Sequence, residues 1–183
     1  MEINNLPKGF FYIPDFIDES QAIYLRDHIL QLTWQEITMY GQTARRRVVH
    51  FGLDYAYENR TVHLTTPPPP FLTPLIQKSA EALQVDEKEI AEILITQYPV
   101  GAGISWHRDA PVFDKILGLS LVSGCPLKLR IPSNKEVIKV HLAPRSAYIL
   151  SDEARIKWQH AISPVKNERY SITLRTLKKP ISR

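Results

Sequence analysis

Short apolar runs, separated by turn residues, make up most of the second half of the chain. The separating residues are Gly118, Gly124-Cys-Pro126, Pro132-Ser-Asn134, Pro144 and Pro164. We expect residues 91–98 to form a strand, and we expect six further strands after it: residues 116–122, 127–131, 137–142, 147–150, 156–162 and 170–177. Several short strands at this spacing predict a sandwich or a jelly roll.

Two stretches with helical periodicity lie nearer the start of the chain. Asp18 and Gln21 have the spacing of an N-terminal capping box, and an apolar stripe with helical spacing follows to about residue 32. Thr73-Pro74 predicts the start of a second helix, with a capping hydroxyl and a proline in the first turn. Both helices are expected to buttress the predicted sheets.

The region between these helices is predicted to contain strands and a loop. Trp34–Tyr40 and Arg45–Phe51 predict a hairpin whose loop carries a basic cluster formed by Arg45, Arg46 and Arg47, and Asp54–Tyr57 predicts a further extended piece. The stretch from Glu58 to Pro70 ends in four consecutive prolines and is expected to be a loop.

Length and composition narrow the class of protein. The 183 residues predict a single domain, 1–183, with an ordinary globular balance of 44% hydrophobic and 23% charged residues. Cys125 is the only cysteine, which favours a cytoplasmic protein without disulfides. We expect no membrane span and no signal peptide. The net charge of +4 favours anionic partners, nucleic acid included.

His107 and Asp109 form a candidate pair of metal ligands. Residues two apart on a strand point to the same face, so the imidazole and the carboxylate can reach one ion. A third ligand must come from a distant segment, and His160 is the candidate. Two histidines and one carboxylate leave part of the coordination sphere open, which is typical of non-haem Fe(II) oxygenases. A chance match to this short motif, or a zinc hydrolase with the same ligands, is the alternative.

A second pattern lies in the last predicted strand. Arg169, Ser171, Thr173 and Arg175 alternate with apolar residues, so they share one strand face. Two arginines on an inward face need negative partners, and a dicarboxylate would supply them because a guanidinium binds a carboxylate in a bidentate way. A solvent-exposed edge strand is the alternative.

Taken in order, these motifs resemble the AlkB family of Fe(II)/2-oxoglutarate dioxygenases. His107-x-Asp109, a distal His160 and Arg169-x-Ser-x-Thr-x-Arg175 follow the family pattern over roughly residues 94–177. Upstream, residues 47–57 and 97–104 are most similar to the branch that contains the tRNA wobble-uridine hydroxylases. The resemblance implies a fold that is mainly β with two buttressing helices, a double-stranded β-helix (jelly roll).

The resemblance also implies roles for individual residues. His107, Asp109 and His160 are the expected Fe(II) ligands. The expected 2-oxoglutarate site comprises Tyr98, Arg169, Ser171 and Arg175, and O2 is the second cosubstrate. In the family pattern an asparagine is usual where Ser171 and Thr96 stand, and the DNA-repair members carry an acid where Pro111 stands.

The implied activity is oxidative removal of alkyl groups from damaged bases in DNA or RNA. Residues 34–57 would form a nucleotide-recognition lid, with Trp106, Arg45, Arg46 and Arg47 as substrate contacts, and the protein is expected to be a monomer. Three alternatives remain open: hydroxylation of a modified tRNA base, oxidation of a protein side chain or small molecule, and a non-catalytic nucleic-acid-binding jelly roll.

Overall fold

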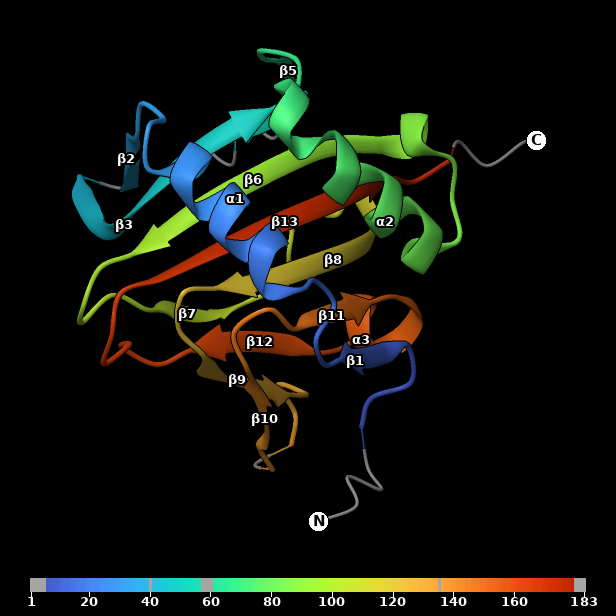
Figure 1. Ribbon diagram of the computed structural model, residues 1–183. Helices are drawn as coiled ribbons and strands as arrows, with labels where there is room; N and C mark the ends of the chain where they lie inside the picture. Colours follow the sequence, from blue (N-terminus) through green and yellow to red (C-terminus); the bar gives the residue numbers. More distant parts are fainter. Residues whose placement is uncertain (1–5, 40, 57–60, 135, 180–183) are drawn as a thin grey trace.

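Two antiparallel sheets face each other, and two helices cover the outer side of the larger one (Figure 1). The computed structural model describes residues 6–39, 41–56, 61–134 and 136–179. Tyr40 and Tyr57, which belong to predicted strands, lie outside the described residues, as do residues 58–60 of the predicted loop. This arrangement confirms the predicted jelly roll with buttressing helices.

The major sheet has seven strands. In spatial order they are β1 (Phe10–Ile13), β11 (Ala147–Leu150), β8 (Phe113–Leu121), β13 (Arg169–Leu177), β6 (Ile90–Tyr98), β3 (Gln42–Phe51) and β2 (Gln35–Met39). The central strand β13 is buried along nearly its whole length, because β6 and β8 pair with its two edges and both of its faces are covered. The predicted inward-facing position of the β13 arginines is therefore confirmed, and the alternative of a solvent-exposed edge strand is excluded.

Helices pack on one face of this sheet. The α-helices are α1 (Glu19–Ile29), α2 (Thr73–Leu83) and the short α3 (Asp152–Ile156); the 3-10 turns are η1 (Pro70–Leu72) and η2 (Glu87–Glu89). The capping box predicted at Asp18 and Gln21 is present at the start of α1. Apolar residues of α1, η1 and α2 form one core with the outward side chains of β6, β13 and β8.

The minor sheet covers the other face and encloses the site. Its strands are β10 (Ile138–Leu142), β9 (Cys125–Arg130), β12 (Gln159–Ile162) and β7 (Ile104–His107), in spatial order. A second apolar core lies between the two sheets. A small separate sheet pairs β4 (Leu53–Ala56) with β5 (Thr61–Leu64). Among the described residues, no helix is both long enough and apolar enough to cross a bilayer.

Several predicted boundaries are wrong. Gly118 lies inside β8 and does not form a turn, and Arg45, Arg46 and Arg47 lie within β3 and not in a hairpin loop. Residues 61–64 of the predicted loop form β5. The predicted strand 156–162 begins only at Gln159, because α3 occupies residues 152–156. In each case pairing with a distant strand, or a local helical turn, overrides the local sequence signal.

Candidate metal and cosubstrate site

The two predicted histidine ligands are held side by side in the minor sheet. His160 of β12 is paired with His107 of β7, and their ring centroids lie 4.2 Å apart. His107 Nδ1 lies 2.8 Å from the carbonyl oxygen of Ser105. If Nδ1 carries the proton and donates to that carbonyl, the lone pair of Nε2 is free to bind a metal.

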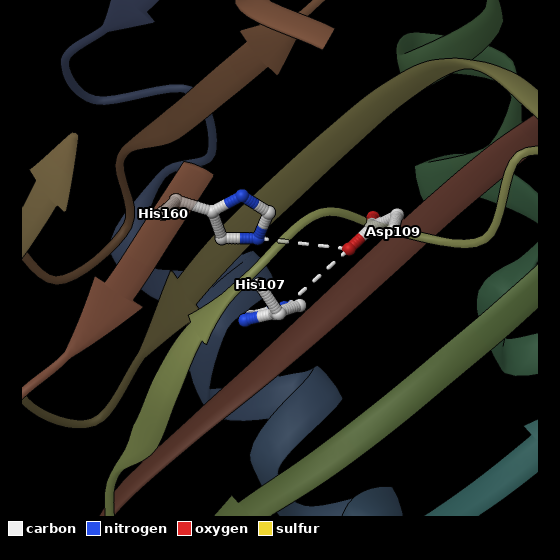
Figure 2. Close-up of side chains that lie close together, drawn as sticks. All are labelled: His107, Asp109 and His160. Atoms are coloured by element: carbon white, nitrogen blue, oxygen red, sulfur yellow. Dashed lines mark ion pairs between the residues drawn. The ribbon is translucent and has the colours of Figure 1, made fainter. Parts of the chain in front are cut away.

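Asp109 completes the group of three. It lies two residues beyond the end of β7, so its position comes from the loop and not from strand alternation as predicted. Asp109 Oδ1 is 3.6 Å from Nε2 of His107 and 3.6 Å from Nε2 of His160 (Figure 2). One ligand atom from each residue lies within 4.8 Å of the others, which is a separation that a single metal ion can bridge.

A buried arginine, Arg175, forms an ion pair with Asp109 and stabilises its ionised form. Arg175 Nε donates to Asp109 Oδ2 at 3.2 Å, and Arg175 Nη1 donates to Glu92 Oε2 at 2.6 Å. Burial alone would raise the pKa of Asp109, but Arg175 and the two histidines outweigh it and hold that pKa well below its usual range. The carboxylate is therefore ionised and fixed in place before any metal binds.

His160 is kept neutral by its surroundings. Burial, with a smaller contribution from the neighbouring His107, lowers the pKa of His160 to about 3. Metals bind the neutral imidazole, so His160 is in the ligand form at neutral pH.

Arg169 occupies the interior of the barrel with part of its guanidinium unsatisfied. Its side chain is 1% exposed, and its Nε donates to Ser120 Oγ at 2.9 Å. The guanidinium carbon lies 5.1 Å from the ring centroid of Tyr98. Arg169 Nη1 is buried and has no hydrogen-bond partner among the described residues. A buried, unpaired N–H of a charged group fits an anionic ligand, and a carboxylate of 2-oxoglutarate has the matching chemistry.

The remaining predicted cosubstrate residues lie on the same inner face. Register across the major sheet places Ser171 beside Ser120 on one side and Thr96 on the other. In the same register Arg169, two residues before Ser171, is paired with Tyr98. The structure thus places Arg169, Ser171 and Arg175 on one face of β13, as strand alternation predicts, with Tyr98 beside them on β6.

The predicted substrate contacts do not lie together. Trp106 precedes His107 on β7, so it points to the opposite, outer face of the minor sheet, where Arg130 lies over its ring with the guanidinium carbon 4.2 Å from the ring centroid. A stacking role for Trp106 inside the iron pocket therefore does not fit this position. Arg47 Nε donates to Gln97. Arg46 Nη1 donates to the carbonyl of Gly103 near the site, and its buried Nε has no hydrogen-bond partner within the part of the chain that the structure describes.

The prediction missed three residues of this site: Glu92, Ser120 and Tyr148. For Glu92 there is a signal, because an acid inside an apolar strand requires a partner. Ser120 has no such signal, because serine is common in strands and turns alike.

Comparison with known sequences gives one family and several relatives. A model of the 2OG-Fe(II) oxygenase superfamily matches residues 9–176. A Xenopus tropicalis protein named tRNA (carboxymethyluridine(34)-5-O)-methyltransferase alkbh8 is 30% identical over 169 residues, covering 88% of this chain and 26% of that protein. An Arabidopsis thaliana protein named Alkylated DNA repair protein ALKBH8 homolog is 28% identical over 189 residues, covering 86% of this chain and 51% of that protein.

Solved structures share the fold. The structure of OsALKBH1 superposes with a TM-score of 0.68 at 16% identity, covering 94% of this chain and 99% of that chain. At this identity the likeness establishes the fold alone. The chain spans only about a quarter to a half of the two sequence relatives, so their full activities do not transfer with the fold.

Proposed function

Because this chain belongs to the 2OG-Fe(II) oxygenase superfamily, we propose that it oxidises a C–H bond on an alkyl substituent of a nucleic-acid base, with tRNA as the preferred substrate. Fe(II), 2-oxoglutarate and O2 are the cofactors of this superfamily, as predicted. The AlkB resemblance is likewise supported by the relatives described above.

One observation carries the enzymatic part of the proposal: three candidate metal ligands, of which Asp109 and His160 are buried and His107 is half-buried, share the barrel interior with a buried arginine whose Nη1 has no partner among the described residues. His107, Asp109 and His160 would hold the iron, and Arg169 would bind the distal carboxylate of 2-oxoglutarate. When bound, the iron couples oxidative decarboxylation of 2-oxoglutarate to oxidation of the substrate C–H bond. Neither a structural zinc site nor a simple nucleic-acid-binding module requires this second, anion-binding feature.

The protein residues contribute positioning and charge. Arg175 keeps Asp109 ionised and oriented, and burial keeps His160 neutral, so these two residues are in the ligand form at neutral pH. Tyr98 lies against the guanidinium of Arg169 and limits the directions in which that side chain can move. The minor sheet covers the site and restricts water around the reacting groups.

The relatives support nucleic acid as the substrate. The name of the Xenopus protein refers to position 34 of tRNA and to a modified uridine. The net charge of +4 and the partly buried Arg46 beside Gly103 suit a polyanionic substrate whose target base enters the pocket. A carbon-bound substituent would leave the enzyme as an alcohol.

Oxidative dealkylation is the second candidate. It has the same first step, but a hydroxylated N-alkyl group collapses and releases an aldehyde. The name of the Arabidopsis relative, which refers to alkylated DNA repair, favours it. Pro111, standing where the DNA-repair members carry an acid, favours tRNA modification instead.

Product analysis separates these candidates. The protein would be incubated with Fe(II), 2-oxoglutarate and ascorbate together with bulk tRNA, N-methylated DNA or RNA oligonucleotides, or unmodified oligonucleotides. Succinate, formaldehyde and nucleoside masses would then be measured. We expect succinate coupled to a gain of 16 mass units on a tRNA nucleoside, without formaldehyde, and loss of both in an Asp109→Ala variant.

Other outcomes decide against parts of the proposal. Formaldehyde release on methylated oligonucleotides alone would replace tRNA hydroxylation by dealkylation. Slow succinate release that ignores every nucleic acid would remove the nucleic-acid substrate and direct the search to protein side chains or small molecules. Absence of succinate under all conditions would contradict the dioxygenase.

A further inference from the structure

Tyr148 lies over a glycine in the middle of the major sheet. Gly118 of β8 is paired in register with Tyr148 of β11. A Cβ atom added at Gly118 would lie 2.5 Å from Cε1 and Cζ of the Tyr148 ring and 2.7 Å from its hydroxyl oxygen. The phenol therefore lies directly against the Gly118 backbone, and any side chain at position 118 would displace it.

This packing brings the hydroxyl to the inner face near Arg169. Ser120, which accepts the hydrogen bond from Arg169 Nε, lies two residues from Gly118 on the same face of β8. Two residues of a strand span roughly 7 Å. The Arg169 guanidinium and the Tyr148 hydroxyl thus occupy neighbouring positions above β8.

The hydroxyl is a free donor. Tyr148 makes no hydrogen bond to the described residues, although its ring packs against Phe10 with centroids 6.2 Å apart. Burial, and then the charge of Asp109, raise the pKa of Tyr148 above its usual value, so the phenol stays protonated. Arg169 Nη1 is likewise without a partner among the described residues.

Two neighbouring free donors match the two oxygens of one carboxylate. Ser171, on the opposite side of Ser120, has a shorter side chain and fewer donors than the asparagine usual in the family pattern. We propose that Tyr148, accommodated by Gly118, donates its hydroxyl hydrogen to the distal carboxylate of 2-oxoglutarate beside Arg169, and so acts as a cosubstrate-specificity residue. This inference rests on the proposed use of 2-oxoglutarate at this site.

A matched pair of tyrosine variants tests it. Tyr148→Phe removes only the hydroxyl and keeps the ring that packs on Gly118 and Phe10. Tyr12→Phe is the control, because Tyr12 is paired with Tyr148 across β1 and β11 and its hydroxyl accepts a hydrogen bond from the backbone N–H of Ala143 instead. Binding is measured by anaerobic calorimetry of the Fe(II)-loaded proteins with 2-oxoglutarate and with 2-oxopentanoate, which lacks the distal carboxylate.

A hydrogen bond to a charged group predicts a loss of roughly 10-fold or more in affinity. We expect Tyr148→Phe to weaken 2-oxoglutarate binding by this factor and to leave 2-oxopentanoate binding unchanged, while Tyr12→Phe changes neither. Equal 2-oxoglutarate affinities for Tyr148→Phe and wild type would overturn the inference and leave the proposed function standing. An equal loss for both ligands would also overturn it, since the effect would then come from packing.

Failure of the proposed function gives a different result. In that case the wild-type protein itself would show no 2-oxoglutarate binding. A Gly118→Ala variant supplies a second test, because the added methyl must displace the Tyr148 ring. It should weaken 2-oxoglutarate binding in the wild-type background and cause little further loss in the Tyr148→Phe background; independent losses that multiply would contradict the coupling.

Discussion

Charged side chains on the inner face of the major sheet are buried and paired, whereas those at the β2–β3 edge of the same sheet are mostly exposed. Glu92, Arg169 and Arg175 on the inner face, and Asp109 in the loop that contacts Arg175, are all at most 7% exposed, and each makes at least one hydrogen bond within the protein. On the edge, Arg45 and Arg47 are exposed and Arg46 is half-buried.

This difference suggests that the residues for the reaction and the residues for substrate recognition can change independently of each other. A buried charge that loses its partner is costly, so the inner-face residues depend on one another and on the fold. An exposed arginine can change with little effect on folding. The residues assigned to iron and cosubstrate are therefore part of the core, whereas the nucleic-acid recognition that we propose would use strands whose exposed residues can vary.

The largest effect is expected from removing the carboxylate that we assign to the metal. Asp109→Ala deletes one of three ligands, and we expect Fe(II) affinity to fall by more than the ~10–100-fold typical of residues that only orient a ligand. Anaerobic Fe(II) titration measures the affinity. Asp114→Ala removes an exposed carboxylate on β8 and serves as the control. Unchanged Fe(II) binding in Asp109→Ala would refute the assigned triad.

Loss of the central arginine should come next. Arg175→Met leaves Glu92 and Asp109 as buried carboxylates without their cation, so we expect a loss of about 3–5 kcal/mol in the free energy of unfolding. Denaturant unfolding of the metal-free protein measures it. Lys179→Met breaks the exposed Lys179–Glu89 pair and should leave the unfolding midpoint nearly unchanged. Similar midpoints for both variants would show that the buried network does not stabilise the fold.

A smaller effect is expected from pH. The pKa of His160 is about 3 in the folded protein and about 6.5 when unfolded. A depressed folded pKa means that the unfolded state binds the proton first, so this stability is present above pH ~6.5 and is lost as the pH falls. The metal-free protein should lose about 2 kcal/mol from this group between pH 7 and pH 5.

His160→Asn supplies the comparison for the pH effect. The other histidines remain in this variant, so the difference between the two stability-versus-pH curves isolates His160. The Asp109 carboxyl also has a depressed pKa, but its contribution is lost only below about pH 4, outside this window. Parallel curves for wild type and His160→Asn would contradict a neutral, buried His160.

Much of the inner face could be predicted from the sequence, because strand alternation carries the information. The pattern Arg169-x-Ser-x-Thr-x-Arg175 defines one face whatever the neighbouring strands are. The same rule applied to Trp106 and His107 would have placed that tryptophan on the outer face, so this information was present in the sequence. The ligand set itself follows from the spacing only in combination with the family resemblance.

Other features depend on register between distant strands, which no local sequence pattern specifies. The Glu92–Arg175 pair exists because β6 and β13 are aligned at these two residues. Gly118 carries the local signal of a turn, yet it lies mid-strand because the Tyr148 ring from β11 needs its space. Arg45, Arg46 and Arg47 carry the signal of a basic loop, yet all three lie within β3, which pairs with β2 on both sides of Arg45 and Arg46 and with β6 from Arg47 onward.

The smallest effect is expected from the arginines of the β2–β3 edge, and it tests most directly whether this edge and the inner face have separate roles. Arg47 is paired with Gln97, so Arg46 is aligned with Tyr98 and faces the site, while Arg47 faces away. Arg46→Ala should weaken nucleic-acid binding severalfold and lower the slope of log affinity against log salt by about 1. Arg47→Ala, whose guanidinium is already held by Gln97, should have less effect. Filter binding at several salt concentrations measures the nucleic-acid affinity and its salt dependence for each variant. Neither change should alter 2-oxoglutarate affinity. Equal losses in the two variants would mean that β3 binds the substrate through general charge and not through the face that Tyr98 shares.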